Sequence, residues 1–177
     1  MTFLSSTNIA ATKPRAVQAI VAAGLLCGVL DITAAFVTAW TRRGIRPIRI
    51  LQGIASGLLG PRSFDGGMQT AALGLGLHFL IAFTAASVFY AASRKLSFMT
   101  QRPIISGILY GVAVYLFMYW LVMPLSNIRR GPFSWSNTII AIITHMVCVG
   151  LPISLMVSRY SRQSGDRNPS CRPLSPR

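Results

Sequence analysis

Residues 70–90 read TAALGLGLHFLIAFTAASVFY, a run that decides the fold because it is long and apolar enough to cross a bilayer as one helix. A spanning helix needs about 20 mostly apolar residues. His78 lies at its middle, and stepping by four residues from it meets Gly74, Ala82 and Ala86. These small side chains share its face and let another helix approach closely. We therefore expect His78 to face protein, not lipid.

The whole chain has the composition of an integral membrane protein. Of its 177 residues, 53% are hydrophobic and 11% are charged, and the mean hydropathy is +0.56. Soluble domains average about 25% charged residues. Three further apolar stretches resemble residues 70–90, so we predict an all-α membrane protein, a four-transmembrane-helix bundle. The predicted parts are a polar N-terminal tail, four spans and a basic, disordered C-terminal tail: 1–15; 16–40, 70–92, 103–124 and 136–157; 158–177.

The connection between the first two spans contains the segment PIRILQGIASGLLG, residues 47–60. Its apolar residues recur at helical spacing, while Arg49, Gln52 and Ser56 fall elsewhere around the helix. About 14 residues are too few to span a bilayer. We predict a short interfacial or re-entrant helix, with a solvated loop as the alternative.

Net charge is +14, from 17 Lys and Arg against three acidic residues. The basic residues lie between or beyond the apolar segments, where they meet anionic lipid headgroups, so this pattern disfavours nucleic-acid binding. The predicted partner is therefore an anionic bilayer, and the headgroup contacts are those of the first connection: Arg42, Arg43, Arg46 and Arg49.

Four spans place both termini on one side of the membrane. That side, with the 94–102 loop, carries ten basic residues against seven in the other two connections, which favours cytoplasmic termini. The first span alone favours the reverse, because its downstream flank is the more basic one. All three tryptophans belong to the side opposite the termini.

Three ionisable side chains lie deep in the predicted spans: Asp31, His78 and His145. At 1.5 Å per residue they sit roughly 21, 20 and 18 Å from the terminal side, and each shares a face with small residues. Tyr115 reaches about 18 Å by the same rise. A charge at mid-membrane is costly without a partner. We therefore predict a buried polar cluster of these four residues, with Asp31 accepting a hydrogen bond from an imidazole.

Three stretches resemble the YagU-like family of small bacterial inner-membrane proteins: GLHFLIAFTAASVFYAASRKL, RPIISGILYGVAVYLFMYWLVMPL and IIAIITHMVCVGLPISLMVSR. The resemblance covers residues 74–159 and depends on His78, His145 and a loose M-x-x-P-L ending in residues 118–125. The segment after the first span departs from the family pattern. The resemblance implies a bacterial inner membrane, four spans, cytoplasmic termini and two recurring histidines, and it implies no reaction.

Several functions fit these residues. A buried cluster that responds to protonation is one hypothesis, because imidazole titrates near neutral pH. In a second, His78 and His145 are axial ligands of a b-type haem, with Gly74 and Gly76 leaving room for the porphyrin. A metal site built with Asp31 has the ligand types of a two-His, one-carboxylate triad.

The remaining hypothesis is a structural membrane component, alone or as a homo-oligomer or in contact with another membrane protein. Glu is absent, and no nucleophile elbow, Walker loop or HExxH motif occurs. Cys27, Cys148 and Cys171 have no metal-site or disulfide spacing. We therefore predict a non-enzymatic protein without a cofactor or a metal.

Overall fold

The computed structural model describes residues 7–127 and 134–165. The elements in chain order are α1 (Thr7–Arg43), α2 (Pro47–Leu59), η1 (Gly60–Phe64), α3 (Gly67–Lys95), α4 (Phe98–Gln101), α5 (Pro103–Phe117), η2 (Met118–Val122), α6 (Met123–Leu125), α7 (Trp135–Thr144), η3 (His145–Gly150) and α8 (Leu151–Gly165). The described part consists of helices joined by short connections and contains no strand. The first helix begins within the predicted tail, and the final helix ends at Gly165. Most of the predicted tail 158–177, including Cys171, lies outside the described residues.

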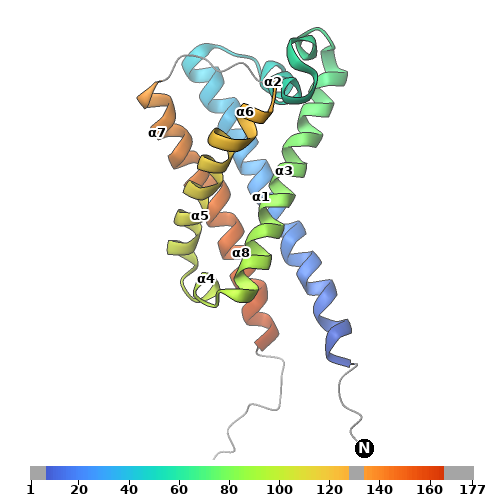
Figure 1. Cartoon of the computed structure of the whole chain (residues 1–177), viewed down its shortest axis with the longest axis vertical. Coiled ribbons are helices and arrows are strands. Elements are labelled where there is room, and N and C mark those ends of the chain that lie inside the picture. The colour runs from blue at the N-terminus through green and yellow to red at the C-terminus, as the bar shows by residue number, and fades with distance from the viewer. Residues whose placement is uncertain (1–6, 128–133, 166–177) are drawn as a thin grey trace, which may run out of the picture.

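Four helical stretches of the described chain are long and apolar enough to cross a membrane: Arg15–Arg43, Gly67–Lys95, Pro103–Leu125 and Trp135–Ser161. They run alternately up and down, so that the start of α1 and the end of α8 lie at the same end of the bundle, called here the terminal end (Figure 1). Helix α2 lies at the other end, beside the start of α3. The predicted four-helix bundle is confirmed to that extent.

The core lies in the half of the bundle nearer the terminal end. It is built from small and β-branched residues of α1, α3 and the η3–α8 stretch around one large ring, Phe89: Ala23, Cys27, Ala82, Ala86, Val149, Ile153 and Val157. Many large apolar side chains outside this core are exposed on the outer surface. A bundle with apolar side chains on its outside fits a multi-pass membrane protein.

Helix α5 is held against η3 by glycines on both sides. A Cβ on Gly111 would lie 2.5 Å from the carbonyl oxygen of His145, and one on Gly150 would overlap the carbonyl oxygen of Gly107. Only a residue without a side chain allows two helices to approach so closely. The spacing of Gly107 and Gly111 is a small-xxx-small pattern that favours tight helix packing, and their contact with η3 fixes the backbone of His145.

Two of the spans contain a π-helical turn, and each turn lies just before a proline. The segment η2 precedes Pro124, and η3 precedes Pro152. A proline inside a helix donates no hydrogen bond and its ring displaces the carbonyl four residues earlier. Widening the preceding turn accommodates both effects, and such π-turns are frequent at functional sites. The second one begins at His145.

The predicted short helix between the first two spans exists as α2, and it packs with its polar side inward. Gln52 is 3% exposed and Ser56 is 6% exposed, whereas Leu58 on the apolar side is 62% exposed. The Gln52 amide donates to the carbonyl of Gly67 at the start of α3. Gly74 of α3 makes this contact possible, since its missing side chain leaves room for the Leu51 carbonyl. Whether α2 is interfacial or re-entrant stays a prediction.

Candidate functional site

Helices α1 and α7 enclose a cavity of about 320 Å³ in the half of the bundle away from the terminal end. Asp31 and His145 lie at its deep end, and Arg42 and Arg43 lie where α1 ends. The other polar lining groups are Thr38, Asn137 and Thr144, among alanines and isoleucines. From Asp31 to Arg42 the cavity follows α1 for about 16 Å, so it is long and narrow. Its volume falls at the lower limit for small-molecule pockets, or suits a short file of water molecules.

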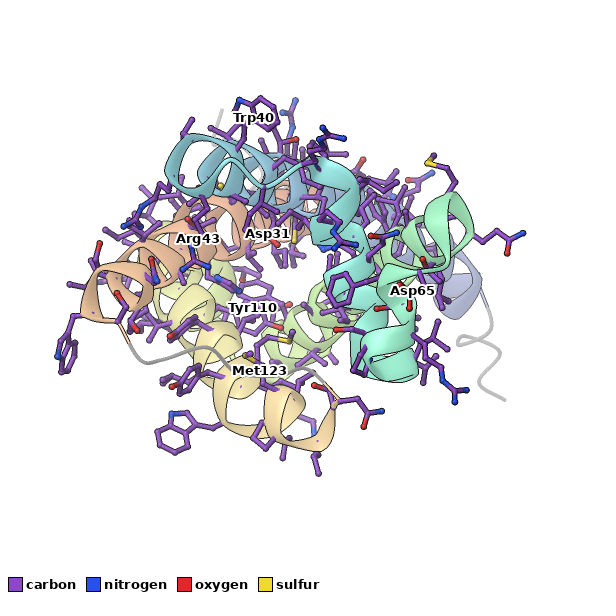
Figure 2. The ribbon with its side chains drawn as sticks, turned by 90° about the horizontal axis from the view of Figure 1, so that it is seen from above. Asp31, Trp40, Arg43, Asp65, Tyr110 and Met123 are labelled. Atoms are coloured by element: carbon purple, nitrogen blue, oxygen red, sulfur yellow. The ribbon has the colours of Figure 1, made fainter. Side chains whose placement is uncertain are left out.

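Asp31 opens onto this cavity without a partner from the protein. Its side chain is half-buried, and it forms no hydrogen bond or ion pair within residues 7–127 and 134–165. Seen along the bundle, it lies on the inner side of α1, toward the middle of the ring of helices (Figure 2). A carboxylate in an apolar span needs water, a proton or a cation to offset its desolvation. The cavity is the space onto which Asp31 faces.

His145 is held in one orientation by its own helix and by α5. Its Nδ1 lies 2.8 Å from the carbonyl oxygen of Ala141, and because a carbonyl only accepts, Nδ1 carries the donated proton. The ring of Tyr115 packs edge-on against the imidazole with 5.6 Å between centroids, and Tyr119 stacks on Tyr115. Nε2 has no hydrogen-bond partner among the described residues.

The mouth of the cavity is cationic and is bridged on one side. Arg42 donates from Nη2 to the Ser136 hydroxyl at 2.9 Å, which joins the end of α1 to the start of α7. Arg43 lines the cavity without a hydrogen bond among the described residues. Two guanidinium groups at a narrow opening raise the local concentration of anions and oppose the entry of cations.

The described residues show no buried cluster of Asp31, His78, His145 and Tyr115, and Asp31 accepts no hydrogen bond from either imidazole, so the predicted cluster is wrong. Asp31 and His145 share only the lining of one cavity. His78 does not line the cavity, because its ring turns to α1, where Nε2 donates to the carbonyl oxygen of Gly28 at 2.9 Å. Gly28 has no side chain to cover that carbonyl, and Phe79 packs over the same glycine. The three residues lie at similar depth along the bundle. The rotation of each helix about its own axis points the His78 side chain to Gly28 and not into the cavity.

The described residues contain no group of three His, Cys, Asp or Glu side chains close enough to hold a metal ion. This arrangement contradicts the three-ligand site that the sequence suggested. The porphyrin of the haem hypothesis fits poorly as well, since the space beside Gly74 is filled by the Leu51 carbonyl and Nε2 of His78 already binds a carbonyl. Cys27 and Cys148 are free thiols.

The four arginines predicted at lipid headgroups have different surroundings. Arg42 and Arg43 line the cavity, and Arg46 lines an open recess beside α2. Arg49 is bound within the protein: Nη1 donates to the Gln52 side chain at 3.3 Å and to the Phe64 carbonyl at 3.1 Å, and the guanidinium lies over the Phe64 ring. Its role in the structure is to fasten η1 to α2.

The sequence prediction missed the polar residues between the mouth and the deep end. Thr38 and Arg42 follow Asp31 on one face of α1 at seven and eleven residues. Asn137 and Thr144 stand seven residues apart on α7 and share a face in the same way. This helical spacing of polar residues leading to an intramembrane carboxylate is the signal that identifies the cavity.

The fold and the cavity define a class: a protein with four helices that fit a multi-pass membrane protein and a cavity lined by both apolar and ionisable residues. No family model, curated protein or solved structure matches the chain. The resemblance to the YagU-like family therefore stays a prediction from the sequence.

Proposed function

We propose that the protein is a non-enzymatic integral membrane protein in which Asp31 and His145 form a proton-responsive pair, reached through the α1–α7 cavity. The observation that carries the proposal is that both side chains line the deep end of the same cavity. His145 has one nitrogen free to exchange a proton, and Asp31 has no partner in the described chain.

Besides His145, the cavity is lined by one acidic side chain, Asp31, and two basic ones, Arg42 and Arg43. Tyr115 presents a ring edge to the imidazole. A proton that binds Nε2 of His145 changes the net charge of the cavity. His145 stands at the start of the π-turn η3, where Gly111 of α5 packs against its backbone. Gain and loss of that proton therefore bias the position of α7 relative to α1.

Nuclear magnetic resonance of the ring nitrogens tests the pair directly, since the chain has only two histidines. A His78→Gln variant leaves one signal and assigns it to His145. Titration from about pH 8 to about pH 5.5 spans the range in which imidazole changes charge. We expect Asp31→Asn to alter the titration of His145 and to leave that of His78 unchanged. Equal behaviour of both rings in Asp31→Asn would contradict the pair.

Cysteine labelling tests whether water reaches the cavity. In a background with Cys27, Cys148 and Cys171 replaced by serine, Ala35→Cys places a thiol on the cavity wall and Val37→Cys places one on the exposed outer face of α1. A membrane-impermeant maleimide reacts with hydrated, ionised thiols. We expect it to label Ala35→Cys and to spare Val37→Cys in vesicles. Equal labelling of the two positions would show that the cavity is not a separate aqueous path.

We also propose a bacterial inner membrane with cytoplasmic termini, as a member of the YagU-like family. The basic residues support this orientation, ten against seven. Both described chain ends lie at the terminal end, so they share one side (Figure 1). Fusions of green fluorescent protein and of alkaline phosphatase to the C-terminus give the test. Fluorescence without phosphatase activity is expected, and the opposite pair of results would reverse the orientation.

A further inference from the structure

The ring of four spans is open between α3 and α5. Helix α3 packs against α1 and α2, and α5 packs against η3 and α8, whereas α3 and α5 do not pack along their lengths. Tyr110 of α5 bridges the two helices: its ring contacts buried Phe89 edge-on with 4.9 Å between centroids, and its hydroxyl donates to the Ala85 carbonyl at 2.7 Å. Figure 2 places Tyr110 of α5 on the inner side, toward α3.

From this bridge toward the end opposite the termini, the two helices enclose an apolar groove of about 430 Å³. Leu80 and Val88 form one wall and Ala113 and Phe117 form the other. The two side-chain hydroxyls that line it are already used, because Thr84 donates to the Leu80 carbonyl at 2.8 Å and Tyr110 donates to α3. The groove therefore offers no free side-chain hydroxyl to a polar ligand.

We propose that this α3–α5 groove binds one acyl chain of a membrane phospholipid. Along α5 it extends from Tyr110 to Val122, which is about 18 Å at 1.5 Å per residue. One leaflet of a bilayer core is about 15 Å thick, half of about 30 Å. Along α3 it extends from Leu80 to Val88, which is about 12 Å, so the lengths of the two walls bracket that of a single acyl chain of one leaflet.

The groove is smaller than a helix of a second copy. Its volume is about 430 Å³, whereas a helix about 10 Å across fills about 1,400 Å³ over about 18 Å. A methylene chain is narrower than a helix. Lipid tails are as apolar as the groove walls, so the binding energy comes from close van der Waals contact along the chain. This site is independent of the Asp31–His145 pair.

Native mass spectrometry of the full-length protein tests the site. The protein is reconstituted with phosphatidylethanolamine and phosphatidylglycerol and then passed through extensive detergent exchange. Ala113→Trp fills the groove from α5, and Thr84→Trp fills it from α3. Leu116→Trp adds the same bulk on an exposed face of α5 that does not line the groove.

We expect the wild-type protein and Leu116→Trp to retain one phospholipid molecule, and both groove variants to retain it about tenfold less. Using two groove variants guards against one that fails to fold. Equal retention in all four proteins overturns the site, and so does a wild-type protein that retains no phospholipid. If the wild-type protein is a dimer and the groove variants are monomers, the groove binds a second copy, and the proposal is overturned.

Discussion

Helices α7 and α8 belong to one span, yet they pack in opposite ways. None of the residues of α7 is buried, and α7 forms one wall of the polar cavity. In α8, Ile153, Ser154 and Val157 are completely buried against α1, α3 and α5. The π-turn η3 separates the two helices and begins at His145. The difference shows that one apolar span supplies both a closely packed core and one wall of a cavity.

The two halves differ in the polarity of the residues that face them. Around α8, glycine and alanine allow helices to meet backbone to backbone, so little space is left. Around α7, the facing residues of α1 include the carboxylate of Asp31 and the hydroxyl of Thr38. Such polar groups are costly to bury in a packed apolar interior. The two halves make different predictions for the same kinds of substitution.

The largest effect on the free energy of unfolding is expected at Gly150, where η3 joins α7 to α8. Gly150→Leu places a side chain against the backbone of Gly107 and should lower the free energy of unfolding by more than about 3 kcal/mol or prevent folding. Gly76→Leu is the matched control, because nothing lies within 4 Å of a Cβ at that position. Unfolding by denaturing detergent measures both. Equal losses would show that α5 and η3 are not in close contact.

An isoleucine in each half gives the next comparison. Ile153→Ala empties a fully buried position of α8 and should cost about 2–4 kcal/mol. Ile140→Ala removes the same atoms from the wall of the cavity on α7, where about 1 kcal/mol or less is expected. The same unfolding titration reports both values. A larger loss from Ile140→Ala would reverse the assignment of core and cavity.

The hydrogen bond between α3 and α1 should have a smaller effect. His78→Leu keeps an apolar side chain and removes the donor to the Gly28 carbonyl, and interhelical hydrogen bonds contribute roughly 0.6 kcal/mol each in a membrane protein. We expect a loss of that size with an unchanged labelling pattern of Ala35→Cys. If His78→Leu changed that labelling, His78 would belong to the cavity after all.

The smallest effect on stability is expected at Asp31. Asp31→Asn removes a charge that has no hydrogen bond or ion pair in the described chain, so the free energy of unfolding should change by less than about 0.5 kcal/mol. The same variant should alter the titration of His145. A large loss of stability with an unchanged titration would make Asp31 a packing residue.

Before any tertiary structure, the sequence determined the number of spans and their approximate limits. Uninterrupted apolar length is a local property, and the predicted spans 70–92 and 103–124 lie within the spans Gly67–Lys95 and Pro103–Leu125. The small-residue faces around His78 and the Gly107–Gly111 pair were also visible in the sequence, since helical spacing defines a face.

The tertiary structure alone decided which ionisable residues meet. Depth is set by the rise along one helix, whereas partners are set by the rotation of each helix and by glycines such as Gly28 and Gly111. These contacts turn His78 to a carbonyl of α1 and leave Asp31 and His145 in one cavity. They also turn the polar side of α2 inward. Such choices depend on residues far apart in the chain, which local patterns do not record.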